Sequence, residues 1–409
     1  MNKIKIILIV CLIIYLLTAF GTEILYRNKL YEISVDYIEK IKQEGFFHYF
    51  YYFWSVIFLL AIMIIGITIT LVFYPINIFF SYLSLQIILV FIMCLLKSLY
   101  SNPRPMWDIY LENQKNRTDI FLPTPTECDG GFGNPSGHAL SSTYILSLWD
   151  LFINSHYFRK IEGKKKLFVK YFTLILSLTC IIFIIYSRIN RQIHSFNQII
   201  FGTILGFAVI FTFCYILDIN KKDTNIFMEA LNTYKFILIP IFIILFATSV
   251  ILGLLRHNNN EEKYLFILEN YCHYTKEQLF GKNTTLFSSI ILLFIGSYVG
   301  LLFLRYKIKK KNLNNEKVFY NWNKYNKKQI CKIISISFIF PSIFIIPIFL
   351  ISYKYYIIKF IISSICLLIY GFLSFGPCFY YSCLVFKKSE FVEDELLINN
   401  NENEEENNF

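Results

Sequence analysis

Apolar blocks about the length of a membrane-crossing helix alternate with short polar stretches along most of this chain. A helix needs roughly 20 apolar residues to cross the hydrocarbon core of a bilayer. We count nine such blocks after residue 50, which predict an all-α, polytopic membrane protein with about nine transmembrane helices. The blocks lie at 51–73, 76–96, 139–154, 168–186, 196–217, 235–255, 286–305, 330–352 and 356–386.

The two ends of the chain follow other patterns. Lys3 and Lys5 precede a short apolar run that ends in Ala19-Phe20-Gly21, which is typical of a signal peptide or of a retained signal anchor. Polar sequence follows and is predicted to form a lumenal segment, whereas the Asn- and Glu-rich C-terminal tail is predicted to be disordered and cytosolic. The predicted divisions are the signal segment 1–21, the lumenal segment 22–50, a first membrane region 51–217, a four-helix membrane region 218–386 and the tail 387–409.

Composition and charge place the chain among integral membrane proteins. Apolar residues make up 56% of the 409 positions and charged residues 16%, whereas soluble chains carry about a quarter charged residues. The loops after the third, fifth and seventh blocks are the basic ones, so these loops are predicted to be cytosolic. Because the net charge of +11 reports orientation in such a protein, we expect no nucleic-acid partner. The ten cysteines include no Cys-x-x-Cys pair and indicate no metal or redox motif.

Two glycosylation sequons agree with this orientation. Asn116 and Asn283 begin the Asn-x-Ser/Thr sequences that have no proline at the middle position. Both fall in loops that the charge pattern places in the lumen or outside the cell, where glycosylation can occur.

Residues suited to chemistry lie on the same outer side, at the ends of three predicted helices. In chain order, the three groups are Lys97 with Arg104, Ser136 with His138, and Arg188 with His194. Phosphoryl chemistry requires such a set, because Arg presents a planar fork of donors to phosphate oxygens and Lys adds a compact charge. We expect Pro135 to be the first helical residue of the third block, so that Ser136 and the amides behind it hold an anion. Two His can divide the reaction between nucleophile and acid, and no metal is required.

Each residue taken singly has a simpler interpretation. A basic residue at a membrane border usually extends towards the lipid head groups, and a Pro-Ser-Gly stretch usually forms a turn. A single His beside a helix end is usually a structural hydrogen-bonding group, and this interpretation holds for the other four His. The hypothesis therefore depends on the ordered combination of all three groups.

That combination resembles the three-part motif of the type-2 phosphatidic acid phosphatase and haloperoxidase superfamily. The resemblance implies a helical catalytic core within residues 51–217 and hydrolysis without a metal or other cofactor. It also implies that His194 is the nucleophile that forms a phosphohistidine and that His138 acts as acid and base. The residues that would hold the phosphoryl oxygens are Lys97, Arg104, Ser136, Gly137 and Arg188.

One position departs from the superfamily pattern. Four residues after the nucleophile, where Asp is common, this chain has Gln198, whose amide oxygen can accept the imidazole N–H but adds no charge. With an amide at this position, the sequence resembles the glucose-6-phosphatase branch of the superfamily. Members of that branch have nine spans, an active site in the lumen of the endoplasmic reticulum, and a glycosylated loop at the place where Asn116 lies. The resemblance implies that glucose 6-phosphate is hydrolysed to glucose, with membrane lipid around the site and a sugar-phosphate transporter as a partner.

Two alternatives remain open. A lipid-phosphate phosphatase would use the same residues on phosphatidate, a sphingoid phosphate or a polyprenyl diphosphate, although many such enzymes have about six spans and Asp in place of Gln198. A non-catalytic anion transporter would also place basic residues near helix ends, but it gives no reason for three motifs in order.

Overall fold

The computed structural model describes the part of the chain that builds the membrane helices. The described residues are 3–40, 46–73, 76–116, 131–152, 163–211, 235–255, 264–265, 269, 272, 280–310 and 327–385. Regular secondary structure within these ranges is helical, which confirms the predicted all-α fold. The first half of the basic loop at Arg159–Lys166 (residues 159–162), the pair Lys221 and Lys222, and the tail 387–409 lie outside the described residues.

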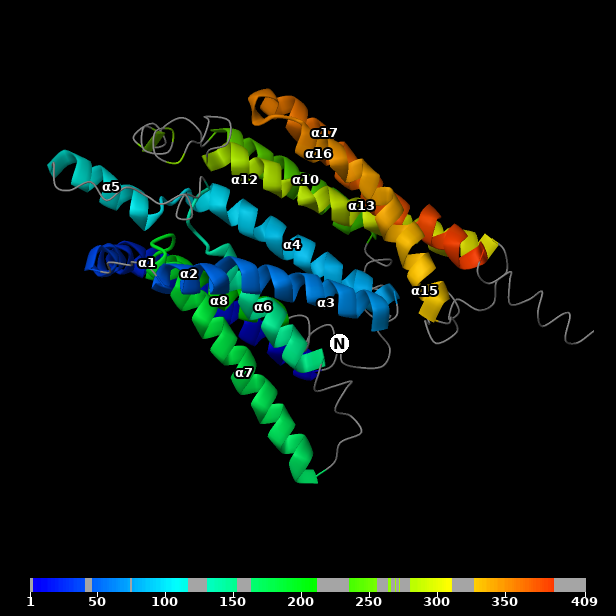
Figure 1. The fold of residues 1–409 in the computed structure, drawn as a ribbon, viewed down its shortest axis with the longest axis horizontal. Coiled ribbons are helices and arrows are strands. Elements are labelled where there is room, and N and C mark those ends of the chain that lie inside the picture. Colours follow the sequence, from blue (N-terminus) through cyan, green and yellow to red (C-terminus); the bar gives the residue numbers. More distant parts are fainter. Residues whose placement is uncertain are drawn as a thin grey trace, which may run out of the picture. The chain divides into compact units, whose positions relative to one another are not determined.

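Figure 1 shows the helices as a ribbon. Their bounds are α1 Lys3–Lys40, α2 Phe46–Tyr52, α3 Leu59–Phe73, α4 Ile76–Tyr100, α5 Pro105–Asn116, α6 Gly137–Phe152, α7 Gly163–Asn190, α8 Phe196–Phe211, α10 Lys235–Leu255, α12 Phe280–Ser288, α13 Ile290–Lys310, α15 Lys327–Ile334, α16 Ile346–Leu350 and α17 Tyr356–Phe375. A π-helical turn at Phe53–Phe58 joins α2 to α3. Between α15 and α16 the chain forms a π-helix at Ser335–Ile339 and then a 3₁₀-helix at Phe340–Ile345. Pro341 explains this irregularity, because it cannot donate a helical hydrogen bond.

Seven helical segments of the described chain are long and apolar enough to cross a membrane. They are Ile6–Lys40, Tyr49–Thr68, Phe79–Leu111, Leu167–Asn190, Thr284–Ile308, Lys328–Leu350 and Tyr356–Val385. Phe196–Phe211 and Ile239–Gly253 are shorter apolar helices. The protein is therefore a polytopic integral membrane protein, while the predicted number of nine spans is not confirmed.

Apolar side chains on the outer surface of α7 agree with this class. Phe168 is 70% exposed and Ile182 is 64% exposed, and similar residues lie between them on the same helix. A contiguous apolar surface of this kind is unfavourable in water and is expected to face lipid.

The chain forms two compact units. Unit 1 contains residues 1–69 and 81–288, and unit 2 contains residues 70–80 and 289–409. In unit 1, α6 packs against both α7 and α8, and α8 also packs against α1. Their shared core includes Ala19, Tyr144, Ile184 and Phe201, one residue from each of these four helices.

Unit 2 is built on the pair α13 and α17, which pack along their length. Phe375 is the centre of an aromatic cluster there, with its ring centroid 5.8 Å from Phe79, 5.3 Å from Phe80 and 5.2 Å from Phe338. Gly300 on α13 allows the close approach, because a Cβ at this position would lie 2.7 Å from the carbonyl oxygen of Phe372 on α17. Small residues at helix contacts are typical of membrane helices, which associate through close packing.

The N-terminal helix crosses the expected boundary between the signal segment and the lumenal segment. Residues 3–40 form one continuous helix, so the structure has no break at residue 21, where the sequence pattern suggested a signal segment followed by a polar one. A helix of 38 residues is about 57 Å long, well beyond the roughly 30 Å hydrocarbon core. The apolar first half of α1 is therefore long enough to cross a membrane, and its polar second half continues beyond it.

Candidate active site

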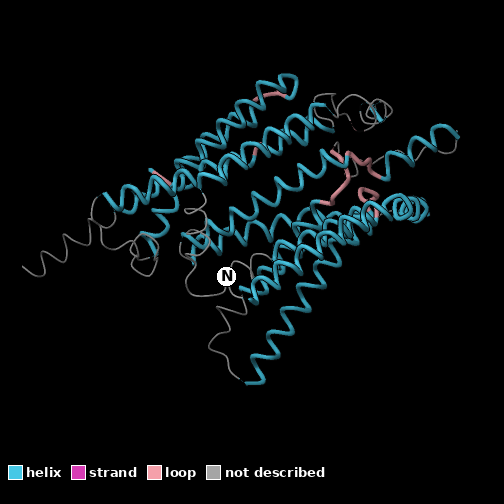
Figure 2. The backbone as a smooth tube through the Cα atoms, turned by 180° about the vertical axis from the view of Figure 1, so that it is seen from behind, coloured by secondary structure: helices cyan, strands magenta, loops and turns pink. Residues whose placement is uncertain are grey.

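Three short loops of unit 1 gather at one end of its helices. Figure 2 shows these segments in pink; they carry residues 101–104, 131–136 and 191–195. The Gly133 N–H donates to the Asn102 carbonyl at 2.9 Å, and Arg104 Nη1 donates to the Ile193 carbonyl at 3.3 Å. The three motifs found in the sequence are therefore brought together at this end.

Two of the basic residues lie in the last turns of helices. Lys97 is in the last turn of α4 and Arg188 in the last turn of α7, where the carbonyl ends of the helix favour a positive charge. A left-handed residue ends each helix: Ser101 has φ 49° and donates its N–H to the Lys97 carbonyl, and Gln192 has φ 59°. After α7, the Gln192 N–H bonds to the Ile189 carbonyl and the next N–H bonds to the Arg188 carbonyl. This Schellman arrangement turns the chain sharply into the segment that carries His194.

The cations of the first motif hold the loop that precedes the second motif. Lys97 Nζ donates to the Phe132 carbonyl at 2.8 Å, and Arg104 Nε donates to the Gly131 carbonyl at 2.7 Å. Arg104 is 1% exposed. An ammonium group has three donors and a guanidinium five, so the same side chains can hold this loop and a phosphoryl oxygen at once.

The second motif is placed by the cap of α6. The helix begins at Gly137, and Ser136 is its N-cap, since the Ala139 N–H points to Ser136 Oγ at 3.5 Å. The expectation that Pro135 is the first helical residue is therefore wrong, because the first turn closes on the Ser136 carbonyl, to which the Leu140 N–H donates. The Ser136 N–H itself donates to the Gln198 carbonyl at 2.9 Å. The amide groups at Gly137 and the following residue form a helix N-terminus, which favours an anion.

Gln198 fixes the orientation of the predicted nucleophile. His194 Nδ1 lies 3.1 Å from Gln198 Oε1, and the Ser195 N–H donates to the same oxygen at 3.3 Å. Gln198 Nε2 donates to the Pro103 carbonyl at 2.9 Å. The carbonyl partner of Nε2 and the N–H partner of Oε1 agree on the amide orientation, so His194 Nδ1 carries the hydrogen.

The other ring nitrogen of His194 is then the one with the lone pair. It lies 3.4 Å from Arg104 Nη1, and the His194 side chain is 1% exposed. The neutral imidazole therefore directs its Nε2 lone pair towards the Arg104 guanidinium.

A glycine allows the Gln198 amide to reach this position. A Cβ on Gly133 would lie 2.5 Å from Gln198 Nε2 and 2.6 Å from Oε1. Any side chain at position 133 would displace the amide that orients His194, so the loop before the second motif and the helix of the third motif fit each other only with glycine here.

Burial and positive charge act on both imidazoles. Burial lowers the pKa of His194 well below its ordinary value, and the charges of Arg104, Arg188 and Lys97 lower it further, while the bond to Gln198 opposes the shift. Burial likewise lowers the pKa of His138, followed by the charges of Arg188, Arg191, Lys97 and Arg104. Both rings are therefore neutral near pH 7 while the site holds no anion.

The structure also brings three further buried polar residues to the three motifs. Arg191 is buried, donates to Ser55 Oγ, and lies with its guanidinium carbon 5.1 Å from the ring centre of Tyr52. Its spacing in the third motif was visible in the sequence, but its neighbours on α2 and the π-helical turn were not. Asn134 and Asn197, which flank the second and third motifs, are also buried.

Asp108, just after the first motif, accepts two tyrosine hydroxyls. Tyr31 of α1 donates to Oδ2 at 2.6 Å and Tyr264 donates to Oδ1 at 2.5 Å. Burial and the neighbouring carboxylate raise the pKa of Tyr264, so this hydroxyl remains a donor. The cluster ties α5 to two segments that lie far from it in the sequence.

The predicted glycosylation sites lie on helices where they are described. Asn116 is the last residue of α5, and Asn283 lies in α12, so the expectation that Asn283 falls in a loop is wrong. The helix begins at Phe280, earlier than the apolar block, because the polar residues before the block continue its first turns. The side chains of both Asn lie outside the described ones.

Comparison with known proteins identifies the part of the chain that carries the site. Residues 75–222 match the family model of the PAP2 superfamily. The matched range contains all three motifs, so the resemblance inferred from them is confirmed over this range, and this part of the chain is similar to that superfamily of phosphatases. No curated protein and no solved structure matches the chain.

Proposed function

We propose that this protein is a membrane phosphohydrolase that releases inorganic phosphate from a phosphomonoester through a phosphohistidine at His194. The observation that carries the proposal is the pair of contacts at this ring. Gln198 accepts at Nδ1, and Arg104 lies beside Nε2. A purely structural role for His194 does not explain why its lone pair faces a guanidinium. Nor does it explain why four cations gather around the two imidazoles, namely Lys97, Arg104, Arg188 and Arg191.

The proposed reaction uses the two imidazoles in turn. His194 Nε2 attacks phosphorus while the bond to the leaving oxygen breaks, and protonated His138 gives that oxygen a proton. Water then attacks the phosphohistidine, His138 takes a proton from the water, and the bond between nitrogen and phosphorus breaks. In this scheme Lys97, Arg104, Arg188 and the N-terminus of α6, at Ser136 and Gly137, hold the phosphoryl oxygens.

The lowered pKa of His138 fits this scheme only if the substrate raises it. A bound phosphate dianion brings negative charge next to an imidazole that four cations otherwise keep neutral. We therefore propose that His138 takes up its proton when the substrate binds, so that the acid is formed in the complex and not in the free protein.

Glucose 6-phosphate, hydrolysed in the lumen of the endoplasmic reticulum, is the substrate that we propose. The amide at position 198 favours the glucose-6-phosphatase branch. Gln198 Nε2 donates a hydrogen bond to the Pro103 carbonyl, which an ionised carboxylate at this position could not do. Cys272 is disulfide-bonded, which supports a lumenal or exterior position for this residue. Asn116 and Asn283 are the proposed glycosylation sites on the same side.

A specific feature favours a lipid phosphate as the second candidate. A groove between α1 and α8, with a cavity of about 250 Å³, is lined by apolar residues including Ile200, Phe201 and Ile204. Asn197, which adjoins Gln198, also lines this groove. An acyl chain fits the apolar part of this lining better than a sugar does.

Phosphate release by purified protein tests the proposal. In the presence of a chelator, wild-type protein should hydrolyse glucose 6-phosphate and form an acid-labile phosphoryl adduct at His194, and His194→Ala should do neither. Hydrolysis of short-chain phosphatidate alone would replace the sugar substrate by the lipid and leave the site assignment intact. Activity that survives in His194→Ala would overturn the mechanism.

A further inference from the structure

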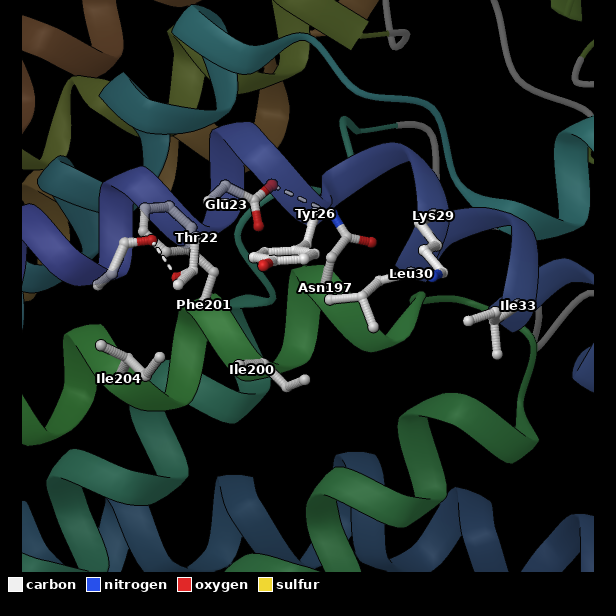
Figure 3. Close-up of a pocket in the computed structure, with 11 residues that line it drawn as sticks. Thr22, Glu23, Tyr26, Lys29, Leu30, Ile33, Asn197, Ile200, Phe201 and Ile204 are labelled. Atoms are coloured by element: carbon white, nitrogen blue, oxygen red, sulfur yellow. Dashed lines mark hydrogen bonds between the residues drawn. The ribbon is translucent and has the colours of Figure 1, made fainter.

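A buried carboxylate on the N-terminal helix lies between the second and third motifs. Glu23 is 5% exposed, and its Oε1 accepts Asn134 Nδ2 at 2.6 Å and Asn197 Nδ2 at 3.1 Å. Figure 3 shows Glu23 on α1 facing Asn197 on α8, and both residues line the groove between these helices. One carboxylate oxygen therefore joins two side chains that are 63 positions apart in the sequence.

Both asparagines adjoin the proposed catalytic machinery. Asn134 comes directly before Pro135 and the N-cap Ser136, which begins the proposed phosphate-binding helix α6. Asn197 lies in the first turn of α8, accepts the Ser195 hydroxyl at 2.6 Å, and directly precedes Gln198. A movement of either asparagine would displace a group that holds phosphate or orients the nucleophile.

The same face of α1 makes two further contacts with this region. Ser34 Oγ accepts the Phe196 N–H at 2.8 Å, which satisfies an amide in the first turn of α8. Tyr31 donates to Asp108 on α5. Positions 23, 31 and 34 share one helical face, so α1 presents a polar edge to the site.

The first half of α1 holds this edge in place. Tyr15 donates to the Ile204 carbonyl at 3.2 Å, and the ring centre of Phe20 lies 5.2 Å from that of Phe201. Ala19 is buried in the core of unit 1. These contacts come from the residues that the sequence pattern assigned to a signal segment.

We infer that Glu23 is a positioning residue, which fixes Asn134 and Asn197 and through them the phosphate-binding turn and the His194–Gln198 pair. The inference rests on the proposed function, since it assigns Glu23 to that site. The acceptor oxygen is the essential feature, because both partners donate N–H groups. Loss of the acceptor leaves two buried amide donors unsatisfied, and a displacement of about 1 Å at a catalytic site lowers turnover by as much as about 100-fold.

The test compares two substitutions of similar length at Glu23. Glu23→Gln keeps an acceptor oxygen and should retain kcat/KM within about threefold, whereas Glu23→Met removes it and should lower kcat/KM by roughly 10- to 100-fold. Glu32→Met is the matched control, because Glu32 is an exposed acid on the same helix. Equal activity of Glu23→Met and Glu32→Met would overturn the inference.

A second pair of variants covers the case in which Glu23→Met does not fold. Asn197→Asp places two carboxylates against each other and should reduce activity strongly, and adding Glu23→Gln should restore it by exchanging donor and acceptor. No restoration by the second substitution would count against the inference.

Orthovanadate binding separates this inference from the proposed function. Glu23→Met should weaken vanadate binding by about tenfold relative to Glu32→Met, as expected for a displaced anion site. If wild-type protein binds vanadate but hydrolyses no phosphomonoester, the proposed function fails while weaker binding by Glu23→Met still supports the positioning role. A wild-type protein that neither binds vanadate nor hydrolyses phosphate would overturn both.

The N-terminus of the mature protein provides a further test. Because Tyr15, Ala19 and Phe20 seat α1 on α8, mass spectrometry of the purified protein should recover peptides that contain these residues. A mature, fully active chain that lacks residues 1–21 would contradict the positioning role of α1.

Discussion

The two units of this protein fill their interiors in different ways. In unit 1, buried polar side chains bond between segments that are far apart in sequence, as Arg104 does to Gly131 and Ile193 and Glu23 does to two asparagines. In unit 2, the buried polar side chains of the described residues are serines and Lys359. Ser297 and Ser382 donate to carbonyls of their own helices, at 2.7 and 2.9 Å, and the Ser382 hydroxyl lies 3.1 Å from that of Ser337, so this bond between distant segments joins neutral groups.

This difference separates chemistry from packing. Hydrogen bonds to charged groups contribute about 1.5–3 kcal/mol each and depend on partner and direction, so they can hold catalytic groups in one geometry. Serine hydroxyls bonded within their own helix leave the helix surface small and apolar, which permits the close approach of α13 and α17. We therefore expect substitutions in unit 1 to change turnover and substitutions in unit 2 to change stability.

The largest expected effect comes from the proposed nucleophile. His194→Ala should lower kcat on the order of 10⁴-fold or more, because no other group could form the covalent intermediate. Phosphate release and trapping of the phosphorylated protein measure this effect. Ser382→Ala in unit 2 is the control and should leave kcat within about threefold; a similar loss in both variants would end the distinction between the units.

Gln198 should have the next largest effect on turnover. Gln198→Leu removes the acceptor at His194 Nδ1 and should lower kcat on the order of 100-fold. From sequence alone, Gln198→Asp should be tolerated, since Asp also orients an imidazole. The bond from Nε2 to the Pro103 carbonyl changes this expectation to about a tenfold loss, because the shorter carboxylate cannot donate there. Activity of Gln198→Asp at or above the wild-type level would show that the Pro103 bond is dispensable.

Gly300 tests the packing of unit 2. Gly300→Ala places a Cβ 2.7 Å from the Phe372 carbonyl oxygen and should destabilise the protein by about 1–3 kcal/mol. Thermal unfolding in detergent should show a lower midpoint, while the kcat of the folded fraction stays close to the wild-type value. A variant with unchanged stability and reduced kcat would reverse the roles assigned to the two units.

The two imidazoles of unit 1 should make stability depend on pH. Their pKa values are lowered in the folded protein, so the unfolded chain takes up protons first as the pH falls below about 6.5. Stability should therefore be constant above that pH and fall below it, by at most about 1.4 kcal/mol per imidazole for each pH unit. Unfolding midpoints measured between about pH 7.5 and 5.5 give the slope. His138→Gln and His194→Gln should each reduce it, and an unchanged slope in both variants would exclude this origin.

The smallest expected effect concerns the end of α4. Ser101 has φ 49°, so Ser101→Gly should relieve backbone strain and raise stability by up to about 1 kcal/mol. The gain is reduced by the loss of the hydrogen bond from the Ser101 hydroxyl to the Ser98 carbonyl. Ser101→Val, with a branched side chain at positive φ, should lower stability. Thermal unfolding distinguishes the two, and a stabilising valine would contradict the assigned conformation.

Much of the fold and most of the site could be predicted from local sequence. Apolar blocks predict membrane helices because the length and apolar content of each block can be read without knowing what it packs against. The predicted all-α membrane class is confirmed. The motif residues were recognisable by spacing, and the structure brings Lys97, Arg104, Ser136 and His194 to the same loops. The expected start of α6 at Pro135 was two residues too early, because the choice between N-cap and first turn depends on which carbonyl closes the turn.

The amino-acid sequence by itself thus determined the helices, the membrane class and the residue types that suit phosphoryl transfer, since these depend on periodicity and on side-chain chemistry. Only the tertiary structure decided that Glu23 reaches Asn134 and Asn197, that the Gln198 amide lies against Gly133, and that α1 is one helix of unit 1. A buried hydrogen bond between distant segments produces no periodic pattern of residue types from which it could be predicted. It arises when packing removes water from both partners and each must find the other.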